Sequence, residues 1–592
     1  MKNINVIIIL MFCSFIINNF CYAQTKLNAD VYASYFGTSG EEDNLYIATD
    51  KTGNVIIAGH TYGTDLQTKN AMQSNNKGIP DGIIVKFNPD MTAIIFSTYL
   101  GGSDYDEIKG FATDEAGNIY VTGGTASNDF PVTPNALIKI HHTGMDAFLT
   151  KLSPSGQLLY SSYIGGSGND FGMDISVVDT SVVCLVGTTI SDDFPAVEGN
   201  TITLKGGQDI FIIKLDLSKD TILFSKVIGG SSDESVFNLK TDKAGSIYFS
   251  GITTSSDFPV FNAPNSAYHG NEDGFIVKLD ANGAMIYSRL IGGSGYDAIV
   301  GIDVNNAGET YFFGSSNSSG LPCTANAFNT HILGDFDVIF GKLSSVGDSI
   351  LYLSYFGGSG KDNALDNGGN NYYFPGRIGY LNNETVVITG NTMSAAFPVT
   401  ANAYDKSVGN YDGFVSVLNL ATKEILYSTF LGGSAYEEPD GINIANDSTI
   451  FISGTTSSSN FPYTQSAFKK TLTGSSDAFF ARFILHRSVT GVNNKNKVLP
   501  GGFNLYQNYP NPFNPATNIQ YSLNQSSKVR LTVYNQLGQK IKTLVDSFQN
   551  AGEHSTVWNG TDDSNKLAGS GVYFYKIETN NTTIQKKMIL IR

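Results

Sequence analysis

Cysteine and histidine are too scarce in this chain to build a disulfide framework or a zinc site. Of the four cysteines, two lie in an N-terminal segment that we expect to be removed, which leaves Cys184 and Cys323 at non-equivalent places. The seven histidines are scattered, and the closest pair, His141 and His142, would point to opposite faces of a strand. A packed core must therefore supply the stability.

Positive charge is also in short supply. Charged residues make up 15% of the sequence, and the formal net charge is −16. The residues from Leu505 onwards contain nine Lys and Arg against five Asp and Glu, so the acidic excess belongs to the preceding body. Because an acidic body repels phosphate backbones, nucleic acid is not an expected partner. The nucleophile motif Gly-x-Ser-x-Gly, the P-loop and the dinucleotide fingerprint are missing from any suitable context.

What is abundant points to strands. Apolar residues make up 41% and aromatic residues 12% of the chain, which is ample for packed cores. The 63 glycines and 31 tyrosines suit many short strands joined by tight turns. We therefore expect an all-β protein.

The N-terminus has the layout of a secretory signal peptide. Lys2 precedes an apolar run from Val6 to Phe20, and a small residue, Ala23, follows. The run is shorter than the roughly 20 apolar residues that a membrane-spanning helix needs, which disfavours the alternative of an uncleaved anchor. We expect residues 1–23 to be the signal peptide, with cleavage between Ala23 and Gln24.

A phrase of the type Tyr-Ser-Thr-Tyr-Leu-Gly-Gly-Ser recurs seven times and dominates the sequence. The intervals between the first glycines of successive copies are 64, 64, 64, 63, 65 and 75 residues. These glycines are Gly37, Gly101, Gly165, Gly229, Gly292, Gly357 and Gly432. Such a period marks a solenoid, a propeller or an array of repeats.

Each repeat contains four strand-like runs. In the copy that starts at Asp106, two hairpins are joined by a longer loop that contains Asp129-Phe-Pro-Val132. Four antiparallel strands in each of seven units match a seven-bladed β-propeller. The period is too long for a β-helix and too short for tandem immunoglobulin-like domains of about 100 residues each. We expect the propeller to span residues 24–484.

The ends of the array predict how the ring closes. The chain begins with an isolated strand-like run, Tyr32 to Phe36, and the seventh blade lacks its last strand after Phe479 to Phe483. We expect these two runs to pair, because closure removes exposed sheet edges.

A polar stretch, residues 485–503, reads as a linker to a second domain. Beyond it, Val-Arg-Leu-Thr-Val-Tyr and Gly-Val-Tyr-Phe-Tyr-Lys-Ile alternate as half-buried strands do. We expect residues 504–592 to form a small β-sandwich.

The repeat motifs resemble a known family. Gly-Gly-Ser-x-x-Asp, the Asp-Phe-Pro loop and the strand Asp-(Ala/Gly)-Phe-x-x-Lys-Leu are similar to SBBP repeats, which are bacterial seven-bladed propeller sequences, over about residues 24–484. The resemblance implies the fold and an extracellular setting. Three copies depart from the pattern: Thr64-Asp-Leu66 lacks Phe-Pro, Leu321-Pro-Cys323 replaces it, and Val417 replaces the strand lysine.

Residues 504–592 closely resemble the type A C-terminal sorting domain of the bacterial type IX secretion system, with Asn559 and Asn565 as minor departures. The resemblance implies that the protein crosses the outer membrane after signal-peptide export. It also implies that the secretion machinery recognises the folded tail and that the tail is removed near the linker. We therefore expect a secreted or outer-membrane surface protein.

Two series of acidic residues repeat with the blades. One follows the Gly-Gly-Ser turns, with Glu41 or Glu42 in the first copy, and comprises Asp106, Asp170, Asp233, Asp297, Asp362 and Glu437. This ring could gather calcium, the one cofactor that we consider. The alternative, which we favour, is that each carboxylate accepts hydrogen bonds from its own turn. The second series opens the third strand of every blade and is expected to be structural.

The sixth interval carries an insertion of eleven residues within Asp362–Gly376. It presents Tyr372, Tyr373 and Phe374 close to the first strand of its blade, where we expect the mouth of the central channel. Aromatic faces beside polar groups suit a sugar or a peptide. The alternative is a loop that only plugs the channel or covers a blade.

The favoured function is a monomeric, non-catalytic propeller that binds an extracellular glycan, a protein or another envelope component. The second hypothesis is an extracellular polysaccharide lyase or hydrolase with acid and base groups gathered on one face. The third is a purely structural envelope protein. Fold alone does not decide among the three.

Overall fold

The computed structural model divides the chain into two compact units, Met1–Thr490 and Gly491–Arg592. It describes residues 25–197, 202–366, 372–373, 375–382, 384–489, 504–508, 511–523, 526–549, 552–564, 566–579 and 583–591. The expected signal peptide, with Ala23 and Gln24, lies outside these residues, as does Phe374. None of the described residues forms a helix long and apolar enough to cross a membrane.

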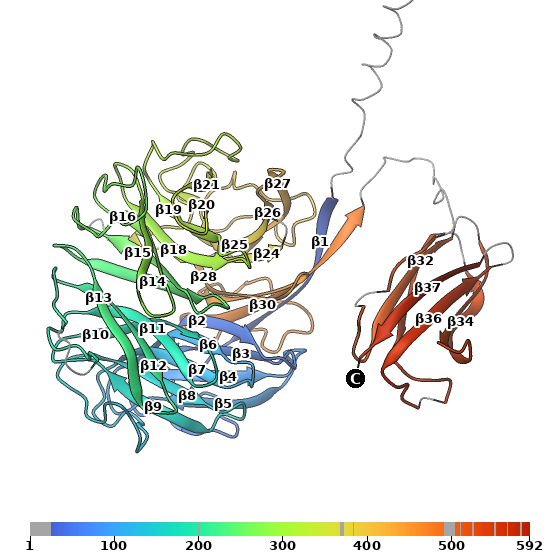
Figure 1. The fold of residues 1–592 in the computed structure, drawn as a ribbon, viewed down its shortest axis with the longest axis horizontal. Helices are drawn as coiled ribbons and strands as arrows, with labels where there is room; N and C mark the ends of the chain where they lie inside the picture. The colour runs from blue at the N-terminus through green and yellow to red at the C-terminus, as the bar shows by residue number, and fades with distance from the viewer. Residues whose placement is uncertain are drawn as a thin grey trace, which may run out of the picture. The chain divides into compact units, whose positions relative to one another are not determined.

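The first unit is a ring of four-stranded antiparallel sheets, and Figure 1 shows them following one another from the blue first blade to the orange last strand. The described residues form seven such blades, each numbered in chain order and built from the channel outwards. Blade 1 contains β2 (Glu42–Thr49), β3 (Val55–Thr61), β4 (Asp81–Phe87) and β5 (Ile94–Leu100), and blade 2 contains β6 (Asp106–Thr113), β7 (Ile119–Thr125), β8 (Asp146–Leu152) and β9 (Leu158–Ile164). Blade 3 contains β10 (Asp170–Val177), β11 (Val182–Thr189), β12 (Asp209–Asp216) and β13 (Thr221–Ile228), and blade 4 contains β14 (Glu234–Thr241), β15 (Ile247–Thr253), β16 (Asp273–Leu279) and β17 (Met285–Ile291).

The remaining blades follow the same order with two exceptions. Blade 5 contains β18 (Asp297–Val304), β19 (Thr310–Ser316), β20 (Asp337–Leu343) and β21 (Ile350–Phe356). Blade 6 contains β24 (Arg377–Asn382), β25 (Thr385–Thr392), β26 (Asp412–Asn419) and β27 (Glu424–Leu431), and a separate hairpin of β22 (Leu365–Asp366) and β23 (Tyr372–Tyr373) precedes it. Blade 7 contains β28 (Glu437–Asn446), β29 (Thr449–Thr456), β30 (Asp477–Val489) and, as its outermost strand, β1 (Thr25–Phe36). The predicted all-β propeller of four-stranded blades is therefore confirmed.

The core lies between consecutive blades. Ile56 and Ile84 of blade 1 pack in one cluster with Val121 and Phe148 of blade 2. The middle strands are covered by a neighbouring blade on each side, so β3 and β4 are buried at every position. This two-sided burial explains why these segments read as continuous apolar runs rather than as an alternation.

The N-terminal strand closes the ring as predicted. β1 pairs antiparallel with β30, with Tyr32 opposite Arg482 and Phe36 opposite Ala478. The pairing also continues beyond the blade, because residues 485–489, expected to belong to the linker, extend β30 and pair with residues 25–29. The polar residues of this segment form a strand because β1 supplies the hydrogen-bond partners that solvent would otherwise provide.

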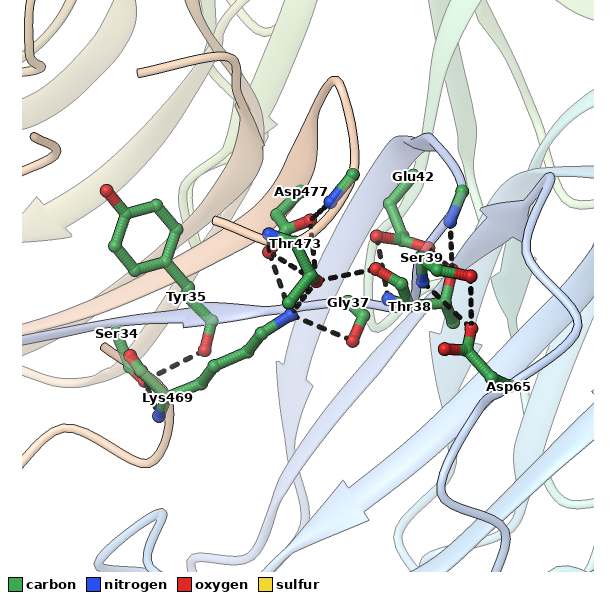
Figure 2. Close-up of polar contacts among 12 residues, drawn as sticks. Ser34, Tyr35, Gly37, Thr38, Ser39, Glu42, Asp65, Lys469, Thr473 and Asp477 are labelled. Carbon is green, nitrogen blue, oxygen red and sulfur yellow. Dashed lines mark hydrogen bonds and ion pairs between the residues drawn. The ribbon is translucent and has the colours of Figure 1, made fainter. Parts of the chain in front are cut away.

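Lys469 fastens this closing strand to blade 7, as Figure 2 shows. Its Nζ atom donates to Gly37 O (3.0 Å) and forms an ion pair with Asp477 Oδ2 (2.8 Å). Its backbone N–H donates to Ser34 Oγ (3.0 Å), and its carbonyl accepts from Tyr35 N–H (3.2 Å). Because Asp477 is fully buried, the lysine also compensates a carboxylate that burial would otherwise disfavour.

The strand lysines of the repeat motif in blades 1, 3 and 4 tie these blades to the ones that follow. They donate through Nζ to carbonyls in hairpin turns of the following blade, namely Lys86 to Pro154 (3.0 Å), Lys214 to Ala281 (2.8 Å) and Lys278 to Ser345 (2.8 Å). Blade 6 has Val417 instead, which packs in one cluster with Leu27 of β1 and Leu485 of β30. The β1–β30 extension therefore replaces a polar tie by an apolar one where the motif is broken.

The second unit is the small β-sandwich that the tail sequence predicts. One sheet contains β31 (Asn504–Leu505), β32 (Thr517–Leu523) and β35 (Gly552–Trp558), and the other contains β34 (Lys540–Gln549), β33 (Ser527–Asn535), β36 (Gly571–Glu578) and β37 (Thr583–Leu590). Trp558, the single tryptophan of the chain, is fully buried in the core of this unit. Its emission therefore reports on the tail alone.

We predict that Lys469→Met destabilises the propeller by about 2–3 kcal/mol, because it removes charged hydrogen bonds and leaves Asp477 buried without its cation. The measurement is urea unfolding followed by far-ultraviolet circular dichroism. The exposed neighbour Lys470 provides the control variant Lys470→Met, and Trp558 emission should report an unchanged tail. Equal propeller midpoints for the two variants would contradict the role of Lys469 in closure.

Candidate functional site at the entry face

The acidic residues that follow the Gly-Gly-Ser turns define one face of the ring, which we call the entry face because the first strands begin there. The inner carboxylates on this face are Glu42, Asp106, Asp170, Glu234, Asp297, Asp362 and Glu437. Each is buried and accepts a backbone N–H of its own turn at 2.6 to 3.1 Å. These bonds are the ones expected of carboxylates that stabilise their own turns.

In blade 4 the structure corrects the predicted ring. Glu234, not Asp233, pairs across the sheet with Thr253, in the way that Asp106 pairs with Thr125. Asp233 lies one residue earlier and is exposed, and its Oδ1 atom accepts from Gln208 N–H (3.0 Å). Side chains alternate along a strand, so only one of two adjacent acidic residues can point into the turn. In blade 1, where both were considered, Glu42 takes this place and Glu41 is exposed.

The second acidic series meets the first at every blade junction. These outer carboxylates are Asp81, Asp146, Asp209, Asp273, Asp337, Asp412 and Asp477. Asp146 accepts from His142 N–H (2.8 Å) and faces Asp170 across Gly165. A β-carbon at Gly165 would lie 2.5 Å from Asp146 Oδ1 and 2.8 Å from Asp170 Oδ2. The first glycine of the motif is thus required for space between two carboxylates.

Burial raises the pKa of the inner carboxylates, to about 6 for Asp106 and Asp170 and to about 7 for Glu42 and Asp362. The outer carboxylate across the junction acts in the same direction, whereas hydrogen bonds from the turn oppose it. Among the described residues, no group of three or more His, Cys, Asp or Glu could hold a metal ion. The arrangement therefore accounts for the ring as a structural device, and calcium binding by it remains only a proposal.

The repeat symmetry breaks at the next position along the first strands. Asp43, Glu107 and Glu438 follow the inner carboxylates of blades 1, 2 and 7, where blades 3 and 4 have Phe171 and Ser235. Blades 7, 1 and 2 are consecutive around the closed ring. One side of the channel mouth therefore carries carboxylates that the fold does not require elsewhere.

Other titratable side chains surround these carboxylates. His60 lies opposite Asp43 in the sheet, with Nε2 4.0 Å from Asp43 Oδ2, and is almost completely buried. Burial lowers the pKa of His60, whereas the neighbouring carboxylates Asp43 and Glu107 act in the opposite direction. Glu107 accepts from the Tyr105 hydroxyl (3.1 Å) and lies 3.3 Å from Lys109 Nζ.

Deeper in the channel, Arg377 of blade 6 approaches blade 1. Its guanidinium lies 5.8 Å from the centre of the Tyr46 ring and donates to Gly376 O (2.8 Å). Asp440 of blade 7 accepts from Leu45 N–H (3.4 Å). Burial, with Glu438 and Asp43 adding repulsion, raises the pKa of Asp440 well above its usual range. We call Asp43, His60, Glu107, Lys109, Arg377, Glu438 and Asp440 the mouth cluster.

The blade 6 insertion enters the first strand at the entry face. Asp362 and Asn363 bridge to β25, and the chain then leaves to form the β22–β23 hairpin before β24 resumes at Arg377. The insertion ends beside blade 7, where Gly376 N–H donates to Pro439 O (3.0 Å). Of the predicted site residues, Tyr372 and Tyr373 form β23, and Pro439, which accepts from Gly376 N–H, immediately precedes Asp440 of the mouth cluster.

Sequence reasoning missed the mouth cluster. The signal was present, because aligning the seven copies shows which residue follows each inner carboxylate and where charge replaces apolar or small side chains. The closeness of Arg377 to Tyr46 had no such signal, since it depends on ring closure.

Glycine 165 provides a test of the junctions. We predict that Gly165→Ala destabilises the propeller by about 1–3 kcal/mol, because the added methyl group overpacks a site between two buried carboxylates. Gly320→Ala is the matched control, since a β-carbon at Gly320 meets nothing within 4 Å. Equal thermal unfolding midpoints for the two variants would contradict this account.

The raised carboxylate pKa values predict the pH dependence of stability. A carboxyl group with a pKa near 6 to 7 in the folded ring and about 4 in the unfolded chain binds protons more tightly when folded. The contribution of this carboxyl group to the stability of the folded propeller is complete below about pH 4 and is lost as the pH rises through 6 to 7. The unfolding midpoint of the propeller should therefore rise by about 5 °C or more from pH 7.5 to pH 5.5.

The tail is the internal control for this measurement. The pKa values of its Asp546 and Asp563 are lowered, first by hydrogen bonds from Arg530 and Lys540, so these groups stay charged throughout this window. The midpoint from Trp558 emission should hardly move. A propeller midpoint that falls on acidification would contradict the assignment.

Comparisons with known proteins agree with this architecture. A model of the SBBP β-propeller repeat matches residues 95–131, and a model of the secretion-system C-terminal sorting domain matches residues 507–591. No curated protein matched the chain.

Three solved structures illustrate how distant the structural neighbours are. A Dyadobacter fermentans protein of unknown function is 10% identical, with 78% of this chain and 100% of that chain covered and a TM-score of 0.37. PorZ, a surface component of the type IX secretion system of Porphyromonas gingivalis, is 11% identical, with 93% and 66% covered and a TM-score of 0.25. A Synechocystis apocarotenoid oxygenase mutant is 10% identical, with 69% and 94% covered and a TM-score of 0.28. These similarities are too distant to indicate a function.

The sorting domain indicates export through type IX secretion and implies an interaction with that machinery. The chain therefore contains an SBBP β-propeller repeat and a secretion-system C-terminal sorting domain, and the sorting domain indicates export to the cell surface or the medium.

Proposed function

We propose that this exported propeller is a binding protein that recognises an extracellular glycan or protein at its entry face. The observation that carries the proposal is the break in symmetry at the channel mouth. The inner and outer carboxylates repeat in all seven blades, as structural groups do, whereas the mouth cluster is confined to blades 7, 1, 2 and 6.

The position of the insertion also supports a binding site on the entry face. The β22–β23 hairpin interrupts the first strand of blade 6 and ends against Pro439, one residue from Asp440 of the mouth cluster. An irregular loop carried on a rigid scaffold is the usual place for recognition. Charged and aromatic groups from separate blades can thus meet one ligand at the mouth.

A second candidate is an extracellular polysaccharide lyase or hydrolase. It is favoured by the buried His60 beside Asp43 and Glu107, because side chains whose pKa is perturbed by burial and by neighbouring charges are candidates for acid and base work. The two functions differ in whether the ligand is recovered intact. A structural envelope protein would neither retain a ligand nor release a product.

The test is retention of the exported protein on a panel of glycans and extracellular proteins, with and without calcium, while soluble products are monitored. We predict saturable binding that Tyr372→Ala combined with Phe374→Ala weakens at least about tenfold, a loss of about 1.4 kcal/mol. Ile140→Ser, which changes an exposed residue of blade 2, is the control. Accumulating product would favour the enzyme, and no retention by a folded protein would contradict both.

A further inference from the structure

The loop between the second and third strands covers the outer edge of the sheet in most blades. In blade 2, Thr133 N–H of this loop donates to Ser161 O of the outermost strand (3.0 Å), and Tyr163 N–H of that strand donates to Ile138 O (3.2 Å). The carbonyls that accept a loop N–H in blades 1, 4, 5, 6 and 7 belong to Ser97, Ser288, Leu353, Ser428 and Ala33. The loop thus adds to each of these sheets as a short extra strand.

Blade 3 is different. In its outermost strand β13, Ser225 and Val227 occupy the positions of Ser161 and Tyr163 in blade 2. Among the residues that the structure describes, none of the loop bonds to the backbone of Ser225 or Val227. β13 is buried at two of its eight positions, whereas β9 of blade 2 is buried at five of seven. The outer edge of β13 therefore presents backbone donors and acceptors that the other blades cover.

The sequence of the blade 3 loop explains the difference. The loops of blades 2, 5 and 6 contain Thr-x-Asn-Ala, which begins at Thr133, Thr324 and Thr400. In blade 6, Thr400 N–H donates to Ser428 O (2.9 Å), and Thr400 Oγ1 accepts from Ser428 N–H (3.3 Å). Blade 3 has Val197 at the equivalent place, two residues after the proline of Asp-Phe-Pro. A valine side chain has no oxygen to accept the second of these bonds.

A groove of about 250 Å³ adjoins the open edge. Blade 4 contributes the apolar Pro259, Leu279 and Met285 to its wall, and β13 contributes Lys226. Lys226 is exposed, and its Nζ atom donates to a carbonyl, Gly283 O, rather than to a carboxylate. A chain that lies along β13 therefore meets both an apolar surface and a positive charge.

We propose that the outer edge of β13 is a docking site for an extended segment of another protein, which joins blade 3 as an extra strand and carries a carboxylate next to Lys226. Backbone hydrogen bonds supply the affinity in such strand addition, and neighbouring side chains supply the specificity. The inference is independent of the function proposed above, because blade 3 contributes no residue to the mouth cluster.

The blade 6 loop shows which peptide fits. Asp405 N–H of that loop donates to Thr429 Oγ1 (2.9 Å), and Thr429 occupies the position of Lys226 in its own blade. A peptide with the sequence of the blade 6 loop would therefore place its aspartate beside Lys226. The probe is the synthetic peptide of residues 398–407, Pro-Val-Thr-Ala-Asn-Ala-Tyr-Asp-Lys-Ser.

The experiment measures binding of this fluorescently labelled peptide to the exported protein by anisotropy. We expect saturable binding that Ser225→Pro weakens at least about tenfold. Proline removes the outward N–H at position 225, and an edge strand tolerates proline where that N–H faces solvent. Circular dichroism of the variant checks that the propeller is folded.

A charge exchange tests the same site without a change to the backbone. Lys226→Glu should weaken the peptide at least about fivefold, and a peptide with lysine in place of its aspartate should bind this variant to within about threefold of the original pair. Lys243→Glu, at an exposed lysine in a hairpin turn of blade 4, is the matched control and should leave binding unchanged.

Three results would overturn the proposal. A folded protein that does not bind the peptide leaves Lys226 as a charge that protects the edge from aggregation. Binding that neither Ser225→Pro nor Lys226→Glu changes places the peptide elsewhere on the protein. A doubled mass in light scattering that Ser225→Pro abolishes assigns the edge to a second copy of this chain instead of a peptide.

Discussion

The antiparallel pairing of β1 with β30 is the interaction on which the rest of the structure depends. Blade 7 has three strands from one end of the propeller sequence and its fourth from the other end. Without that fourth strand, β30 would be an open edge and blade 7 would lose the face that packs against blades 6 and 1. The mouth cluster, whose members come from both sides of this closure, exists only when the two ends of the ring are joined.

The junctions between blades show why the repeat has its particular sequence. Two carboxylates from consecutive blades approach each other over a glycine, and the turn that contains this glycine satisfies one of them through its backbone N–H groups. The strand lysine makes a second tie to the next blade. Motif residues that look catalytic in a single copy, namely buried aspartates beside a glycine-rich turn, are thus explained by the need to fasten one sheet to the next.

Much of the fold could be predicted because each blade repeats the same local chemistry. Hairpin turns, apolar middle strands and the period of about 64 residues predicted the propeller. The unmatched run at Tyr32–Phe36 predicted how the ring closes. Local signals failed where the outcome depends on distant partners. Residues 485–489 look like a linker but form a strand because β1 lies beside them. Which of the adjacent acidic residues 233 and 234 points into the turn is decided only by the register between the strands.

The candidate site was harder to predict from the sequence for the same reason. The insertion was visible as a break in the period, whereas the approach of Arg377 to the Tyr46 ring joins two blades and needs the three-dimensional ring. Position-by-position comparison of the copies would have singled out Asp43, Glu107 and Glu438, but not the side chains with which they interact.

The order of the elements along the chain links secretion to completeness. The strand that completes blade 7 from the C-terminal side, β30, is synthesised just before the sorting domain, and its partner β1 is synthesised first. A chain truncated before β30 therefore also lacks the sorting domain that the secretion machinery recognises. Every molecule that presents the tail already contains both β1 and β30. Export through the tail therefore selects chains that contain all the strands needed to close the propeller.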